Sequence, residues 1–245
     1  SQVFDPWGGY SVSTSDNMDA FTYNPAGFGV DHGRQTGWYF SNNSLVVPTQ
    51  LNNPITNQIL SNSLVSATKI NGFGYSLNYY EGDKLFNPSD INVAFASKVN
   101  STTSFGARWS KLNKEISIGI ILRPFNFISL GHTSHFDEEL EKQTSKRTGL
   151  AIRPLNNDRL TIGMDLINEG DSEAYSPFID FLLLPGVSIR NQVYVNDLKN
   201  LQNNSDMNIL TSININFGKS EAYISGSSNS TNNQYSFGMI ETSHK

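Results

Sequence analysis

The sequence predicts an all-β chain that forms a 14-stranded antiparallel transmembrane β-barrel with a short N-terminal helical plug. Two observations lead to this fold class. Apolar and polar residues alternate along most of the chain, as in residues 116–122, and this period of two is typical of strands with one apolar face. Residues 1–32 do not alternate. We therefore expect a plug segment over residues 1–32 and a barrel over residues 33–245.

The composition excludes several classes of protein. Only 16% of the 245 residues are charged, the net charge is −5 and cysteine is absent. Without cysteine there are no disulfide frameworks, thiolate metal sites or cysteine nucleophiles, and without a basic cluster nucleic acid is not an expected partner. No apolar run approaches the roughly 18–20 residues of a transmembrane helix, whereas a spanning strand needs only about 9–11.

The alternation and the turn residues between its segments define the individual strands. We place the strands at residues 33–41, 63–70, 72–80, 90–99, 103–111, 115–122, 126–134, 147–155, 159–167, 176–184, 186–196, 206–217, 219–227 and 234–241. Short joints such as Asn71-Gly72, which suits a primed hairpin turn, alternate with longer ones. The longer joints lie at 42–62, 81–89, 135–146, 168–175, 197–205 and 228–233, and the joint at 112–114 is a brief exception. Tight turns at one end, longer loops at the other and an even strand number are the pattern of an outer-membrane barrel.

The strands of a β-sandwich show the same alternation of apolar and polar residues. Other observations must therefore indicate that the apolar face contacts lipid and not a protein core. The polar faces are rich in Gly, Ser and Asn and carry Arg108, Arg153, Asp165 and Arg190, which an aqueous lumen accommodates. Aromatic residues near predicted strand ends suit the interfacial girdles of such barrels. These aromatic residues are Tyr39, Phe40, Tyr79, Tyr80, Trp109, Phe125 and Phe127.

The segment before the first strand is predicted to fold into the lumen as a small plug. Ser15 and Asp16 are candidate N-caps for a short helix that extends to about residue 23, and Pro25 is expected to end it. Gly27 and Gly29 then allow a sharp reversal into the barrel. Because buried charge needs partners, the lumen arginines are expected to pair with acidic residues of barrel and plug rather than with substrate. The candidate partners are Asp165, Asp16 and Asp19.

Residues 15–29, with the sequence SDNMDAFTYNPAGFG, resemble the hatch motif of the FadL-type outer-membrane barrels. This superfamily contains transporters of long-chain fatty acids and hydrocarbons and the barrel shuttle protein of type IX secretion. The resemblance implies a 14-stranded barrel with an N-terminal hatch. The hatch residues would be Asp16, Asp19, Tyr23, Asn24, Pro25, Ala26, Gly27 and Gly29. Residues 120–124 and 149–155 each contain an Arg-Pro pair at or near the end of a predicted strand. These two segments also resemble the barrel found ahead of a signal-peptide-peptidase (type A) protease domain in some lineages.

The resemblance implies a non-enzymatic protein of the bacterial outer membrane, surrounded by outer-membrane lipid. Because the sequence opens at Ser1 without Met, a basic region or an apolar region, we expect a mature chain whose export signal has been removed. It would bind or pass a hydrophobic small molecule, or present a lipid-facing opening to a partner, with no cofactor and no metal. A second hypothesis is a membrane anchor or scaffold for a periplasmic protease or a secretion-machinery partner, favoured by the short loops, the compact lumen and the non-aromatic C-terminus. A third is a soluble secreted β-protein.

Two chemical alternatives centre on one histidine pair. Imidazole and carboxylate groups at short spacing can bind metal, and the candidates are His132, His135, Asp137, Glu138 and Glu139. His132 also lies near Ser129 and Ser134, and outer-membrane phospholipases use Ser-His-Asn sites on barrel strands, but such a site is defined by geometry that spacing does not supply. We expect an acidic loop at the end of a strand instead.

Overall fold

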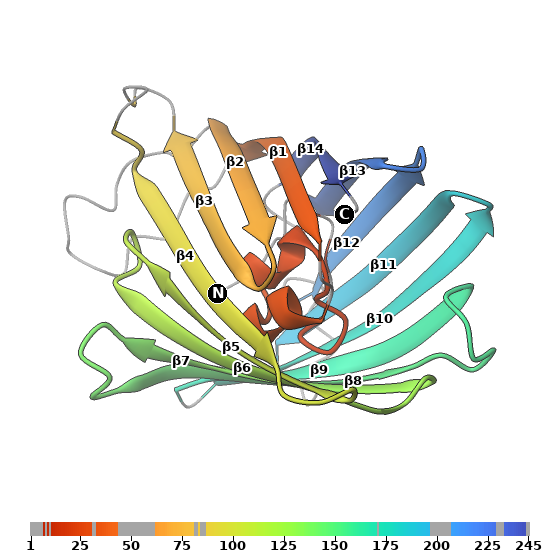
Figure 1. Cartoon of the computed structure of the whole chain (residues 1–245), viewed down its shortest axis with the longest axis horizontal. Coiled ribbons are helices and arrows are strands. Elements are labelled where there is room, and N and C mark those ends of the chain that lie inside the picture. Colours follow the sequence, from red (N-terminus) through yellow and green to blue (C-terminus); the bar gives the residue numbers. More distant parts are fainter. Residues whose placement is uncertain are drawn as a thin grey trace.

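The computed structural model consists of antiparallel strands that close into one barrel (Figure 1). The strands are β1 (Arg34–Asn43), β2 (Asn62–Ile70), β3 (Phe73–Tyr80), β4 (Asp90–Lys98), β5 (Thr103–Ser110), β6 (Glu115–Phe125), β7 (Ile128–Asp137), β8 (Gln143–Ile152), β9 (Leu160–Glu169), β10 (Ser172–Leu184), β11 (Val187–Asn196), β12 (Met207–Asn216), β13 (Ser220–Ser228) and β14 (Asn233–Ser243). Consecutive strands pair with one another, and β1 pairs with β14 from Arg34↔Ser243 to Asn43↔Gln234. This closure confirms the predicted 14-stranded antiparallel barrel and excludes the sandwich.

The structure describes most of the barrel wall and part of the chain before it. The described residues are 7, 9, 11–30, 33–43, 62–80, 83, 87–170, 172–196, 207–228 and 233–243. The longer joints predicted at 42–62, 197–205 and 228–233 lie almost entirely outside these residues, as do most of the first ten residues of the predicted plug. We call residues 11–30 the N-terminal segment.

The two ends of the barrel differ in their connections. We call the end that carries the β2–β3, β4–β5 and β6–β7 joints the turn end, and the opposite end the loop end. At the turn end, Asn71 (φ 45°) and Gly72 (φ 86°) are both in the left-handed region, so the primed hairpin turn predicted there is confirmed.

The outer face of the wall is apolar and the inner face is polar. Phe95 and Ile224 point outward with 60% and 62% of their surface exposed, whereas the inward-facing Asp165 and Ser212 are 0% and 1% exposed. A soluble protein has the reverse arrangement and rarely exposes a continuous apolar surface of this size. The structure therefore assigns the alternating side chains to the faces that the sequence predicted.

Two of the predicted loop-end joints, 135–146 and 168–175, are wrong. β7 continues through Asp137, β8 begins at Gln143, and only residues 170–171 separate β9 from β10. Around these ends both faces of the strands carry polar residues: the cross-strand pairs His135↔Ser145 and Ser134↔Lys146 point to opposite faces. The period of two that marks a strand is therefore lost there, although the backbone pairing continues.

The predicted helix over residues 15–23 is replaced by two short 3-10 turns, η1 (Met18–Phe21) and η2 (Pro25–Gly29). Pro25 begins the second turn instead of ending a helix: it occupies the first position after Asn24, whose side chain accepts a hydrogen bond from Ala26 N. Proline suits that position because the first amides of a helix lack partners in any case. In the described part of the chain, no helix is both long and apolar enough to cross a membrane.

An apolar cluster lies inside the barrel against β1, β2, β4, β13 and β14. It contains Trp7, Met18, Ala20, Phe21, Phe28, Tyr39, Val65, Ala67, Ala94, Tyr223 and Ile240. Tyr39 was predicted for an interfacial girdle, but its ring faces inward and meets Trp7 edge-on, with ring centroids 4.8 Å apart. The alternation explains this correction, because Tyr39 has the opposite parity to the outward-facing Trp38 and Phe40.

The apolar exterior gives a direct test of the surrounding medium. Ile224 lies at the middle of β13, and we expect Ile224→Lys to lower the free energy of unfolding in lipid vesicles by about 2–4 kcal/mol, because a lysine at the bilayer midplane loses its hydration. The control is Leu112→Lys, in the joint between β5 and β6, where the side chain is 48% exposed outside the strands. Urea unfolding of both variants measures the difference, and equal stabilities would show that the outer face does not contact hydrocarbon.

Candidate functional site

The N-terminal segment lies within the ring of strands, where Figure 1 shows its two short turns in red. η2 packs against β4, β5 and β6. Asn24 makes its central contacts: its side-chain amide donates to Val12 O (2.8 Å), Ile120 O (3.0 Å) and His132 O (3.4 Å), while its side-chain oxygen accepts from Ala26 N (3.1 Å). One fully buried side chain therefore joins two parts of the segment to β6 and β7.

Glycines in the middle of the strands let the segment touch the wall backbone. A Cβ added at Gly106 on β5 would collide with the backbone of Pro25, and one added at Gly131 on β7 would collide with the backbone of Val12. At Gly119, on β6 between them, it would collide with the side chain of Asn24. Glycine within a strand marks a close approach of backbone, and here it marks the path of the N-terminal segment across the wall.

Ionic contacts add to this attachment at two places. Near the turn end, Arg123 of β6 forms an ion pair with Asp16. Deeper in the lumen, Asp165 of β9 accepts from Ser11 Oγ (2.5 Å) and Val12 N (3.0 Å), and its carboxylate lies 3.2 Å from Arg147 Nε. Both Asp165 and Arg147 are almost fully buried, so each supplies the charge that the other needs.

Tyr23 lies beneath this ion pair. The guanidinium of Arg147 stands 4.6 Å from the centroid of its ring, within the range of a cation–π contact. Thr133 Oγ1 on β7 donates to Tyr23 O at 2.9 Å. The N-terminal segment is therefore in contact with β8 as well as with its neighbours β7 and β9.

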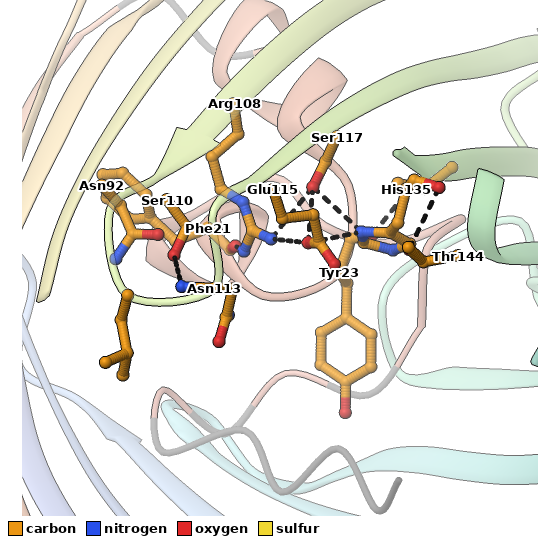
Figure 2. Close-up of polar contacts among 12 residues, drawn as sticks. Phe21, Tyr23, Asn92, Arg108, Ser110, Asn113, Glu115, Ser117, His135 and Thr144 are labelled. Atoms are coloured by element: carbon orange, nitrogen blue, oxygen red, sulfur yellow. Dashed lines mark hydrogen bonds and ion pairs between the residues drawn. The ribbon is translucent and has the colours of Figure 1, made fainter. Parts of the chain in front are cut away.

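A polar network on β5, β6 and β7 lies toward the loop end (Figure 2). Arg108 donates to Glu115 Oε1 (2.8 Å), to Ser117 Oγ (2.9 Å) and to the carbonyl of Phe21 in the N-terminal segment. His135 Nδ1 lies 3.0 Å from Glu115 Oε1 and 2.9 Å from Ser117 Oγ. Each side chain in this network is held by at least two others, so it forms a rigid, charged part of the lumen lining.

Polar cavities lie at both ends of the N-terminal segment. At the loop end, a cavity of about 220 Å³ is lined by Arg108, Glu115 and His135 of the network in Figure 2, together with Arg147 and Glu169. At the turn end, cavities of about 440 Å³ and 350 Å³ border Thr14 and Gly29 of the segment. The segment therefore has polar space on either side along the barrel axis.

The arginines predicted to lie in the lumen do form ion pairs, but with acidic residues other than the expected Asp16, Asp19 and Asp165. Arg108 pairs with Glu115, Arg190 with Asp180 at 3.1 Å, and Arg153 with Asp158 at 3.0 Å near the turn end. Asp16 and Asp165 do meet arginines, but these are Arg123 and Arg147. Asp19 accepts from Asn17 N at 3.0 Å.

The structure separates the histidines of the two chemical alternatives. His135 faces the lumen, whereas His132 faces outward, with Nδ1 2.8 Å from Thr148 Oγ1 and Nε2 3.1 Å from Ser134 Oγ. The proposed metal cluster is therefore not assembled. His132 does meet Ser134, but its other ring nitrogen contacts a hydroxyl group where a catalytic triad has an acid.

Sequence reasoning missed Arg123 and Arg147, because one was assigned to a turn and the other to the start of a strand after a long loop. One available signal was the set of isolated glycines inside otherwise alternating strands, which indicates close backbone approach. The set comprises Gly74, Gly106, Gly119, Gly131 and Gly149. This signal predicts that something lies against the wall, although it does not say which residues.

Comparisons with known proteins relate this chain to others by fold alone. No protein-family model and no curated protein sequence matches it. Among solved structures, it is similar to the deltaS2 mutant of the TodX monoaromatic hydrocarbon channel, with a TM-score of 0.61, 10% identity and coverage of 99% of this chain and 100% of that one. The outer membrane protein Omp33 of Acinetobacter baumannii gives a TM-score of 0.56, 7% identity and coverage of 87% and 99%. A triple mutant of Rhodopseudomonas blastica porin gives a TM-score of 0.53 and 10% identity, with coverage of 86% of this chain and 99% of that one.

All three are β-barrels, and these likenesses place the chain in the same fold as outer-membrane channels.

The glycine contacts predict how the wall tolerates added atoms. We expect Gly106→Ala to destabilise the protein by about 1–3 kcal/mol, because the new methyl group must displace the η2 backbone, and to expose the N-terminal segment to protease. Gly226→Ala on β13 is the matched control, since the nearest atom to its added Cβ is 3.9 Å away. Urea unfolding and limited proteolysis measure the two effects. Equal behaviour of both variants would contradict the tight contact at Gly106.

Proposed function

We propose that this protein is an outer-membrane barrel of the FadL type that binds or passes a small hydrophobic molecule without catalysing a reaction, and that its N-terminal segment is a plug. The observation that carries the proposal is the seating of this segment within a closed barrel whose outer face is apolar. The hatch residues Asn24 and Pro25 lie where the segment meets β5 and β6.

Support for the type of cargo comes from the fold comparison and from the lumen. One structure of similar fold is a monoaromatic hydrocarbon channel. Inside the present barrel, Phe21, Phe28 and Trp7 form part of a buried apolar cluster that touches both the segment and the wall. Movement of the segment would uncover apolar surface in an otherwise polar lumen, and a hydrophobic molecule can bind such a surface.

The scaffold hypothesis is the second candidate, and the charged lining of the lumen favours it. The cavity at the loop end is lined by Arg108, Glu115, Arg147 and Glu169, which suit a hydrophobic molecule poorly. A barrel that stays closed would still anchor a periplasmic protease or a secretion partner. The two candidates differ in whether the N-terminal segment moves.

A permeation experiment on the full chain tests the plug. We expect Asn24→Asp to raise the permeability of liposomes to benzene-sized solutes, because the substitution removes the amide that donates to three carbonyl groups and leaves a carboxylate facing them. Asn216→Asp, at the exposed turn-end limit of β12, is the matched control. A chain that lacks residues 1–30 should be at least as permeable as the Asn24 variant.

A reversible cross-link makes the test sharper, since the chain has no cysteine of its own. Ser104 Oγ donates to Ala26 O at 2.6 Å, so the two residues are neighbours, and cysteines are introduced at both positions. When this cross-link is added to Asn24→Asp, the oxidised form should be closed, and reduction should restore the raised permeability. If every variant is equally closed while heat-modifiable gel migration shows an intact barrel, transport is excluded and the scaffold hypothesis is favoured.

A further inference from the structure

The turn-end cavity of about 440 Å³ contains features of a ligand site that the proposed function does not use. Two guanidinium groups, those of Arg123 and Arg153, line it from the ends of neighbouring hairpins. A backbone contact joins these hairpins, because Arg153 N donates to Phe127 O at 2.8 Å, and Asn156 N donates to Arg153 O at 2.9 Å within the β8–β9 turn. The backbone therefore holds the two arginine positions side by side at this end of the barrel.

The two arginines differ in the ion pairs that they already form within the protein. Arg153 pairs with Asp158, whose side chain is 84% exposed, and such a solvent-exposed pair contributes little to stability. Arg123 donates from Nε to Ser129 Oγ (3.1 Å) and pairs with Asp16 of the N-terminal segment. Asp16 thus demonstrates that the Arg123 position accepts a carboxylate.

The cavity also has an aromatic wall. Phe125 and Phe127 stack with their rings nearly parallel, at 14° and with centroids 5.5 Å apart, and both line the cavity. Asn126, Asn156 and Asn157 also line the cavity, and their side-chain amides can donate hydrogen bonds. The lining includes one carboxylate, that of Asp158, which is the partner of Arg153. A flat aromatic surface beside two guanidinium groups matches a molecule that has a ring at one end and an anion at the other.

We propose that this cavity binds a small aromatic carboxylate from the turn end of the barrel, and that the bound carboxylate competes with Asp16 for Arg123. The ring lies against Phe125 and Phe127, and the carboxylate is shared between Arg153 and Arg123. Since planar guanidinium groups bind carboxylates in bidentate fashion, arginine is the residue that this arrangement requires.

Competition at Arg123 couples the cavity to the N-terminal segment. A ligand that pairs with Arg123 in place of Asp16 weakens one attachment of the segment. By thermodynamic linkage, release of Asp16 from Arg123 strengthens ligand binding by the same factor by which the ligand weakens the Arg123–Asp16 pair. Only the effect on permeation rests on the proposed function of the segment as a plug; the binding itself does not.

Benzoate is the probe, and its affinity for the purified full-length protein is measured by equilibrium dialysis at fixed ionic strength. We expect Arg153→Gln to weaken binding roughly tenfold or more, because a hydrogen bond to a charged group contributes about 1.5–3 kcal/mol. Arg153→Lys should recover only part of the loss. Asp16→Asn should instead tighten binding several-fold, since the internal competitor is removed.

The controls separate this site from general attraction of anions. Lys219→Gln removes one positive charge from an exposed position at the same end of the barrel and should leave the affinity unchanged. Benzyl alcohol, which lacks the charge, and acetate and phosphate, which lack the ring, should bind at least tenfold more weakly than benzoate.

Three results would overturn the inference: unchanged affinity in Arg153→Gln, unchanged affinity in Asp16→Asn, or equal binding of phosphate and benzoate. Heat-modifiable gel migration of each variant establishes that its barrel is intact. If benzoate binds as expected but never alters permeability, the site stands and its coupling to the plug is excluded.

Discussion

The pairing of β1 with β14 is the contact on which the rest of the barrel depends. An open sheet would leave two rows of unpaired amide and carbonyl groups, which are costly in hydrocarbon and prone to aggregation in water. Closure satisfies these groups and at the same time creates an enclosed inner face. The inner face can then be polar, and charged residues such as Asp165 and Arg147 are held in it by each other and by the chain that crosses the lumen.

The polar interior in turn determines how the N-terminal segment is held. Its backbone lies on glycines of the wall, and its free polar groups meet side chains and carbonyl groups of the strands, with Asn24 at the centre. Arg108 and Arg123 fix the segment toward the loop end and the turn end respectively. Such an attachment consists of many moderate contacts, so it can be released in steps when one anchor is exchanged for another partner.

The two proposals concern different parts of this arrangement. The plug proposal depends on the contacts that Asn24 makes in the middle of the wall, whereas the carboxylate site depends on Arg123 and Arg153 at one end. The Arg123–Asp16 ion pair connects them. Because the charged cavities lie outside the apolar cluster around Phe21 and Phe28, one barrel can present a polar site at its mouth and an apolar surface within.

The sequence by itself determined which side chains face in or out, the number of strands and the hairpin turn at Asn71-Gly72, because the alternation and turn preferences act between residues close together in the chain. Only the tertiary structure decided that Pro25 begins a 3-10 turn, that β7 and β8 extend through their polar ends, and which charges meet. The contact between Ser11 and Asp165 joins residues 154 positions apart. Such pairs depend on where the closed ring places each strand, and no local pattern records that position.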